Sequence, residues 1–370
     1  MKKIVIKIGS STLTDGNNRI DRDFLQTIAD QVSAVRDQGW QPIIVTSAAI
    51  ACGLEAMGLE TRPTDIPSLQ AAASVGQSVL ASSYAQAFAA HDVTTSLVLL
   101  TRRDTADRIA YLHARDTFER LLEYGVIPIV NENDTVSVEQ IRFGDNDTLA
   151  ALVGCLVQAD MVVILSDIDG LYDANPNTDH DAHLIPVVEH IDRSVMEVAG
   201  DAGSSIGSGG MITKIKAARV LMAAGIEMVI CQGRAPHIIE DAAAGRGVGT
   251  RFIAAKTPHD ITARKLWIAL GDSAKGSVVV DDGARRALIR QGSSLLCVGV
   301  SRVEGSFEAG DIVDVCDLSG HVIARGKVSA SSDELQLGCG RTSAELESNR
   351  LLAPLAERPV MHRDELIVFE

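Results

Sequence analysis

Aromatic residues are scarce in this chain of 370 residues: Phe, Trp and Tyr together make up 4% of it. A core with so few rings has to be built from Ala, Val, Leu and Ile, which favours helices packed on a parallel sheet. Apolar residues at 46% and charged residues at 22% are ordinary for a globular protein, so wholesale disorder is excluded. The length favours two domains over one.

Net positive charge is also lacking. The chain carries a formal charge of −15 and has a pI near 5.0, which argues against broad electrostatic attraction to nucleic acid or to an anionic membrane. An acidic protein can still bind phosphate groups where a few lysines and backbone N–H groups converge. The charge therefore leaves small phosphate-bearing ligands open.

Several sequence signatures are missing as well. The six cysteines form no C-x-x-C pair, and no apolar run approaches the roughly 20 residues that span a membrane. The first residues, MKKIVIKIGSS, have the pattern of a strand rather than of a signal peptide. We therefore expect reduced thiols, no membrane partner and a cytoplasmic location. The chain has no Walker A loop, and the absence of G-x-G-x-x-G disfavours a dinucleotide-dependent dehydrogenase.

What is present is an alternation of strand and helix patterns, which predicts an α/β fold: a three-layer αβα sandwich around a mainly parallel sheet. Strands are expected at residues 3–8, 94–100, 126–130, 161–166 and 227–233, with another inside 41–53. Near residue 260 short β runs begin to alternate with Gly and Asp turns. We predict a first domain over 1–260, a linker over 261–274, a small β-rich domain over 275–353 and a C-terminal tail over 354–370.

Small and polar residues gather where the predicted strands end, and ligands of open α/β sheets bind beyond the carboxyl ends of strands. The clusters are VIKIGSS (5–11), IIVTSAAIACG (43–53), VNENDTVSVEQIRFGDNDTLAALVG (130–154), VVILSDIDGLYDANP (162–176) and AGSSIGSGGMITKIKAA (202–218). The third holds Asn131, Glu132, Asn133, Asp134, Asp145, Asn146 and Asp147. Each cluster alone could be a turn or a helix cap. Their recurrence on one edge favours a binding site.

The clusters suggest a chemistry. Glycines in the fifth cluster free the backbone to direct N–H groups at phosphate oxygens, and a helix with Lys214 and Lys216 follows. Lysines far apart in sequence, held in register by a carboxylate, could neutralise charge during phosphoryl transfer. The Asn and Asp side chains would suit a small zwitterion. His180 and His183 lie in a polar loop and are expected on the surface; no metal ligands are predicted.

Taken together, the motifs resemble the amino acid kinase family, in the branch that phosphorylates glutamate in proline biosynthesis. They are KIGSS, IVTSAAIACG, AASVGQS, LLTRRD, ARDTFERLL, VNENDTV, GDNDTLAALV, LSDIDGLYDANP and GSGGMITKIKAA, and they run through nearly the whole chain. The segment VVVDDGARRALIRQGSSLL resembles the start of a PUA domain, which many members carry after the kinase domain.

The resemblance implies a role for each matching residue. Lys7 and Lys214 would contact the transferred phosphoryl group, and Asp147 would organise both lysines. The substrate would be held by Ser47, Ala48, Asn131, Asp134 and Asn146. The nucleotide would be held by Lys7, Ser166, Asp167, Ser208, Gly209, Gly210, Met211, Ile212, Thr213 and Lys214. One residue departs from the pattern: the family usually has Gly where this chain has Ala48, so weaker substrate affinity or a shifted loop is expected.

The implied reaction is ATP- and Mg²⁺-dependent phosphorylation of the γ-carboxylate of L-glutamate. A carboxylate is ionised at pH 7, so no general base is needed. The resemblance also implies feedback inhibition by proline and a homo-oligomer, either a dimer or a tetramer. The alternatives are a kinase for acetylglutamate, aspartate, carbamate or a nucleotide monophosphate, and RNA binding through the PUA-like domain. Residues 275–353 hold nine Lys or Arg against eleven Asp or Glu, which lacks the basic footprint of an RNA-binding domain.

Overall fold

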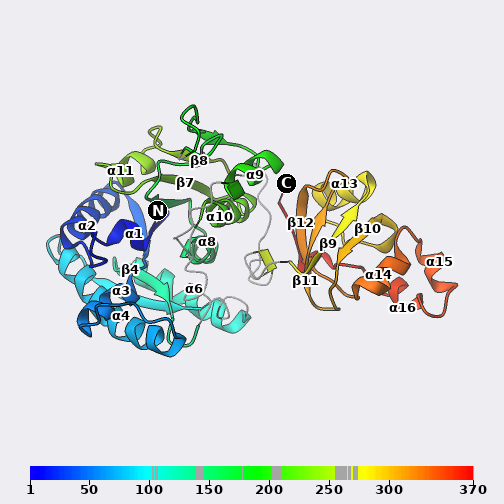
Figure 1. Ribbon diagram of the computed structural model, residues 1–370, viewed down its shortest axis with the longest axis horizontal. Coiled ribbons are helices and arrows are strands. Elements are labelled where there is room, and N and C mark those ends of the chain that lie inside the picture. Colours follow the sequence, from blue (N-terminus) through cyan, green and yellow to red (C-terminus); the bar gives the residue numbers. More distant parts are fainter. Residues whose placement is uncertain are drawn as a thin grey trace. The chain divides into compact units, whose positions relative to one another are not determined.

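The computed structural model (Figure 1) describes residues 1–101, 104, 107–137, 146–176, 178–201, 210–254, 265, 268–269 and 274–369. The chain divides into two compact units: the first comprises residues 1–104 and 109–256, and the second comprises 257–370 with 105–108. Most of the predicted linker, 261–274, lies outside the described residues. Within the described residues, no helix combines the length and apolar character needed to cross a membrane.

The first unit is built on an eight-stranded sheet with the order β3-β4-β2-β1-β5-β7-β8-β6. Its strands are β1 (Lys2–Ile8), β2 (Trp40–Val45), β3 (Thr95–Leu100), β4 (Ile127–Glu132), β5 (Met161–Ser166), β6 (Val187–Val188), β7 (Glu227–Gln232) and β8 (Thr250–Phe252). Every pairing is parallel except that of β7 with β8. The prediction of a mainly parallel sheet is therefore confirmed.

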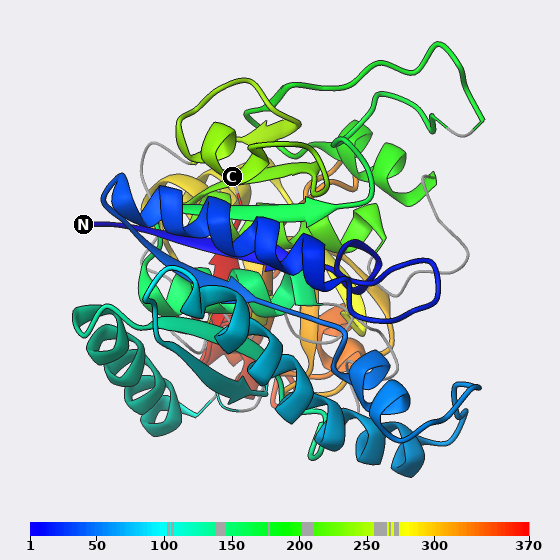
Figure 2. The same ribbon diagram turned by 90° about the vertical axis from the view of Figure 1, so that its left-hand side faces the viewer.

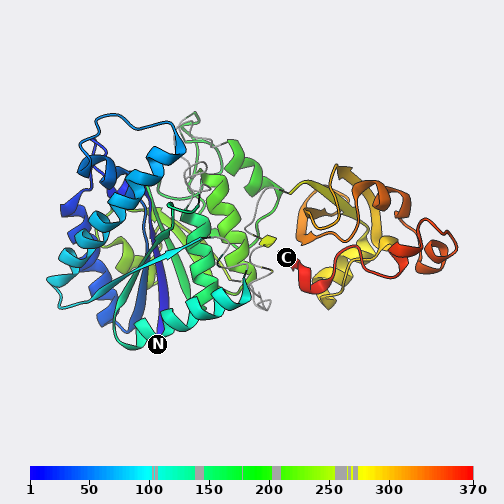
Figure 3. The ribbon, with the colours of Figure 1, turned by 90° about the horizontal axis from the view of Figure 1, so that it is seen from below.

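Helices cover both faces of this sheet (Figure 3). They are α1 (Ser10–Leu13), α2 (Arg22–Asp37), α3 (Ala49–Ala56), α4 (Ile66–Ala89), α6 (Arg108–Glu123), α8 (Asn146–Val157), α9 (Arg193–Asp201), α10 (Met211–Ala223) and α11 (Ile238–Ala243). Local sequence starts the longer ones: the Asp21 carboxylate accepts from the backbone N–H of Phe24, and Asp65 does the same for Ser68. Helix α2 lies along one face of the sheet (Figure 2) and packs against α4 and α11.

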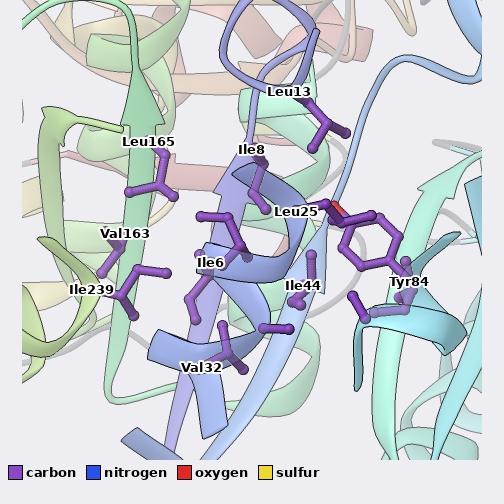
Figure 4. Packing of buried hydrophobic residues seen from close by; sticks show 14 of the residues in the cluster. Ile6, Ile8, Leu13, Leu25, Val32, Ile44, Tyr84, Val163, Leu165 and Ile239 are labelled. Carbon is purple, nitrogen blue, oxygen red and sulfur yellow. The ribbon is translucent and has the colours of Figure 1, made fainter. Parts of the chain in front are cut away.

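Alternation along the central strand β1 separates the core from the site. Ile4, Ile6 and Ile8 point to one face and join the cluster formed with α2, α4 and α11 (Figure 4). Lys7 has the opposite parity, so its side chain points to the other face. Helix α8 packs on strands β1 and β5 there, and α10 packs on α8. A lysine in a central strand of the sheet therefore faces the start of α8.

The second unit has its own five-stranded sheet, with the order β10-β9-β11-β12-β13. Its strands are β9 (Gly276–Val280), β10 (Val300–Gly305), β11 (Ile312–Cys316), β12 (Val322–Lys327) and β13 (Leu366–Val368). Its helices are α13 (Asp282–Gln291), α14 (Ser332–Gly338), α15 (Ser343–Glu347) and α16 (Ala353–Ala356), with 3₁₀ turns η1 (Cys297–Gly299) and η2 (Arg363–Glu365). The predicted β-rich second domain is confirmed. Strand β13, within the segment predicted as a tail, pairs antiparallel with β12.

Candidate active site

The parallel strands β4, β2, β1 and β5 lie side by side, so their carboxyl ends meet at one edge of the sheet. Lys7 lies opposite Val45 on one side and Ile164 on the other, and Val45 lies opposite Val130. Residues at or just after the ends of these strands, including Ser47 and Asn131, therefore come together. The sequence predicted this convergence from the polar clusters that end the apolar runs.

A buried ion-pair centre lies at this edge. The Lys7 ammonium is 2.7 Å from Asp147 Oδ1, and the Lys214 ammonium is 3.0 Å from Asp147 Oδ2. The Thr213 hydroxyl lies 3.2 Å from the same Oδ2 and 2.7 Å from the carbonyl oxygen of Gly210. Asp147 is fully buried, and the two lysines are 6% and 5% exposed. The three predicted catalytic residues are thus one connected group.

The electrostatics of this centre follow from its charges. Burial alone would raise the pKa of Asp147, but the charges of Lys7 and Lys214 outweigh it and hold the carboxyl well below its usual range. Asp147 is therefore ionised at pH 7, and the centre carries one net positive charge from its two lysines and one carboxylate. A net positive, largely dehydrated site is suited to an anionic phosphoryl group.

Next to this centre is a chain of buried amides. Asn146 Nδ2 donates to Ser47 Oγ at 3.0 Å, to Asn131 Oδ1 at 2.9 Å, and to the backbone carbonyl of Thr46. Since a carbonyl only accepts, the atom of Asn146 that faces Thr46 has to be nitrogen, which fixes both amide orientations. Asn146 Oδ1 and Asn131 Nδ2 are then left buried with no partner among the described residues. Such unpaired groups indicate a polar ligand.

Asp134 follows the end of β4, two residues after Glu132, and is 3% exposed. Burial, with a smaller contribution from the neighbouring Glu132 carboxylate, raises the pKa of Asp134 to about 7. Its Oδ1 has no hydrogen-bond partner within the described part of the chain. A buried carboxyl without a counter-charge is suited to a cationic ligand, because a cation would favour its ionised form.

Ala48 has a left-handed backbone, with φ 73° and ψ 9°, at the N-cap of α3. This conformation favours glycine, which explains why the resembling family has Gly there. An L-residue held in this conformation beside a binding site is strained. Having Ala48 in place of glycine therefore raises the conformational energy of the backbone next to Ser47.

We expect Ala48→Gly to raise the free energy of unfolding by roughly 0.5–1 kcal/mol, because relief of the left-handed strain exceeds the added freedom of glycine when unfolded. Urea unfolding of both proteins measures the change. Ala49→Gly is the matched control: it lies at the first position of α3 and should lower stability by a similar amount. Equal losses in both variants would contradict the strain at residue 48.

A cavity of about 480 Å³ opens on the other side of the ion-pair centre. Its lining includes the predicted nucleotide-binding residues Ser166, Asp167, Gly210, Met211 and Lys214. It also includes Tyr172, Asn175 and Pro176, from the DGLYDANP stretch, and Gln232 at the end of β7, which the prediction had not assigned. Because Lys214 both lines the cavity and pairs with Asp147, cavity and centre are contiguous.

The other predicted residues are placed as follows. Ser208, Gly209 and Asp145 lie outside the described residues, and Ile212 follows Met211 in α10 without lining the cavity. His180 and His183 are exposed, as expected. Two glutamines of α4 were missed: Gln70 donates to the carbonyl of Asp134 at 3.0 Å, and Gln77 to that of Glu132 at 3.2 Å.

A parallel αβα unit with a Lys–Asp–Lys centre between a cavity and a polar pocket is arranged for phosphoryl transfer. The profile of the amino acid kinase family matches residues 2–232, and that of the PUA domain matches residues 276–349. The chain therefore belongs to the amino acid kinase family.

Comparison with individual proteins gives more specific matches than the family profile. The glutamate 5-kinase of Geobacter sulfurreducens is 47% identical over 368 residues, which cover 100% of this chain and 98% of that protein. That of Caldanaerobacter subterraneus subsp. tengcongensis is 42% identical, with the same coverage. Among solved structures, carbamate kinase from Giardia lamblia bound to AMP-PNP superposes with a TM-score of 0.51 at 16% identity, covering 69% of this chain and 99% of that one. The last likeness shows the fold alone.

Proposed function

We propose that this chain transfers the γ-phosphoryl group of ATP to the γ-carboxylate of L-glutamate, giving γ-glutamyl phosphate and ADP, the first step of proline biosynthesis. The observation that carries the proposal is the buried Lys7–Asp147–Lys214 centre between the cavity and the amide pocket. The substrate assignment is supported by the whole-length similarity to glutamate 5-kinases.

In this reaction a γ-carboxylate oxygen attacks the γ-phosphorus, a new P–O bond forms, and the bond to the ADP oxygen breaks with its electron pair. Negative charge spreads over the transferred phosphoryl oxygens. The Lys7 and Lys214 ammonium groups neutralise that charge, and Asp147 fixes both without titrating at neutral pH. No proton has to leave the nucleophile, which fits a centre without a histidine.

ATP would occupy the cavity, with its phosphates toward Lys214 and the N-terminus of α10. The described residues contain no group of three or more His, Cys, Asp or Glu side chains that could hold a metal ion. Mg²⁺ would therefore be held chiefly by the nucleotide phosphates, as is usual for this ion, and would neutralise phosphate charge. Asp167 and Asp169, which line the cavity, are candidates for a protein contact.

The test is ADP release with ATP, Mg²⁺ and L-glutamate, with hydroxylamine present to trap the acyl phosphate as a hydroxamate. Glutamate-dependent hydroxamate is the expected result. If hydroxamate formed with aspartate or N-acetylglutamate but not with glutamate, the protein would still be an amino acid kinase, but its substrate would be a different carboxylate. Turnover with none of these carboxylates would overturn the proposal.

The pocket carboxyl Asp134 predicts a pH dependence. Because the pKa of Asp134 is about 7 in the free protein, an ammonium group binds to a fully ionised partner only above that pH. We expect the KM for glutamate to rise roughly tenfold for each unit below pH 7, and Asp134→Asn to flatten this profile. A KM that stays constant from pH 5.5 to 8.5 would contradict it.

Asp134 also makes folding stability depend on pH, in the direction opposite to its effect on glutamate binding. A raised pKa in the folded state contributes stability below the ordinary Asp pKa of about 3.9, and this contribution is lost as the pH rises through about 7. At pH 8, without glutamate, Asp134→Asn should therefore unfold at a higher temperature than the parent protein.

Three further features belong to the proposal. Feedback inhibition by proline is supported by the family resemblance, and unchanged activity with millimolar proline at subsaturating glutamate would contradict it. A dimer or tetramer is expected by light scattering. All six cysteines are free thiols, which supports action in the reducing cytoplasm.

A further inference from the structure

Gln77, in the middle of α4, has a polar atom that the proposed mechanism does not use. Its side chain is 6% exposed, and its Nε2 donates to the backbone carbonyl of Glu132 at 3.2 Å. Its Oε1 is buried and has no hydrogen-bond partner among the described residues. An unpaired buried carbonyl costs free energy unless a ligand supplies the donor.

The orientation of this amide is determined by its neighbour. Exchanging the nitrogen and oxygen of Gln77 would place its oxygen against the carbonyl oxygen of Glu132, which is repulsive. Nitrogen therefore faces Glu132, and the free end of Gln77 is a hydrogen-bond acceptor.

Gln77 also contacts the segment that carries Asp134. Gln70 and Gln77 are seven residues apart, on one face of α4, and both donate to the segment 132–135 that carries Asp134. The adjacent Gly76 packs against the backbone of Ala49, at the start of α3 and directly after Ser47 and Ala48.

Among the buried side-chain atoms without a partner in the described residues are three acceptors, Asp134 Oδ1, Asn146 Oδ1 and Gln77 Oε1, and one donor, Asn131 Nδ2. Gln77 and Asn146 both contact the end of β4, through Glu132 and Asn131 respectively. Three acceptors match the three N–H groups of a primary ammonium. We propose that Gln77 is a specificity determinant that accepts a hydrogen bond from the α-ammonium of the substrate, alongside Asp134 and Asn146. This inference rests on the proposed function.

The proposal explains how the site would reject N-acylated substrates. An acylated nitrogen has a single N–H and no charge, so at least two of the three buried acceptors would stay unpaired. Sites built to hydrogen-bond a substrate group discriminate strongly against analogues that lack it. Gln77 would thus help to separate glutamate from N-acetylglutamate.

The test compares glutamate with glutarate, which lacks only the amino group, in the hydroxamate assay. Gln77→Met preserves the length of the side chain and removes the acceptor. We expect kcat/KM for glutamate to fall roughly 10- to 100-fold, the range for a hydrogen bond to a charged group. The inhibition constant of glutarate should change by less than about threefold. Equal weakening of both compounds, or of neither, would overturn the proposal.

Gln70→Met is the matched control, because it removes a donor from the same segment and no unpaired acceptor. It should affect glutamate and glutarate alike. The unsubstituted protein distinguishes this proposal from the proposed function. If it forms no glutamate hydroxamate, the proposed function is wrong. If it turns over glutamate normally but Gln77→Met weakens glutamate and glutarate equally, only the role of Gln77 is wrong.

Discussion

Asp147→Asn is expected to lower kcat at least roughly 100-fold and to lower the free energy of unfolding by roughly 3–5 kcal/mol. The substitution removes the charge that both lysines share while leaving a side chain of the same shape. Lys7 and Lys214, each less than a tenth exposed, would then lose the carboxylate that both ammonium groups contact. Coupled-enzyme kinetics and thermal unfolding of the same preparation measure both effects.

The pH dependence of this loss has a definite sign. The pKa of Asp147 is depressed in the folded protein, since burial opposes ionisation but the two lysines outweigh it. Its stabilisation is therefore present above the ordinary Asp pKa of about 3.9 and is lost as the pH falls through the lower folded value. The stability difference between Asp147→Asn and the parent should be full at pH 7 and shrink in acid.

A surface pair provides the control. Asp241 accepts from Arg246 at 2.5 Å, but these side chains are 29% and 61% exposed. Asp241→Asn should cost no more than about 1 kcal/mol and leave kcat unchanged. If Asp147→Asn and Asp241→Asn had the same small effect on stability, burial of the Lys7–Asp147–Lys214 centre would not make Asp147 important for stability.

Much of the fold could be predicted because apolar runs mark the buried strands. The expected strand at 161–166 coincides with β5. The strand expected at 126–130 continues two residues further, since Asn131 and Glu132 still pair with Leu99 and Leu100 of β3. A prediction from apolar residues alone stops a strand at the first polar residue. The backbone hydrogen bonds between strands continue, because they do not depend on side-chain polarity.

Site residues could be predicted where several of them lie in one short stretch of the sequence. Lys7, Asp147 and Lys214 were assigned through the family resemblance, because they lie in its motifs KIGSS, GDNDTLAALV and GSGGMITKIKAA. Gln77 was given no role although it lies in the motif AASVGQS, because a glutamine in a helical pattern does not show which groups its amide contacts. Its role depends on which backbone carbonyl lies across from α4, and only tertiary packing determines that.

Packing of α4 on α3 is the clearest case of such tertiary information. A methyl group at Gly76 would overlap the carbonyl oxygen of Ala49 and lie 2.6 Å from the backbone nitrogen of Gly53. A methyl group at Gly53 would in turn overlap the carbonyl oxygen of Ala72. The two helices therefore contact each other backbone to backbone, through one glycine on each.

Gly76→Ala is expected to lower the free energy of unfolding by roughly 3 kcal/mol, the upper range for overpacking, because the obstructing atoms are backbone and cannot rotate away. It should also raise the KM for glutamate, since displacement of α3 moves Ser47 and Ala48, which precede it. Urea unfolding and hydroxamate kinetics at varied glutamate measure the two effects.

Gly200→Ala gives the opposite expectation from the same chemical change. Gly200 lies in α9, and a methyl group there would meet no atom of the described residues within 4 Å. Without a clash, alanine is the better helix former, so stability should rise by roughly 0.5–1 kcal/mol. If Gly76→Ala were as harmless as Gly200→Ala, α3 would be free to move away from α4. The substrate pocket would then not depend on this contact.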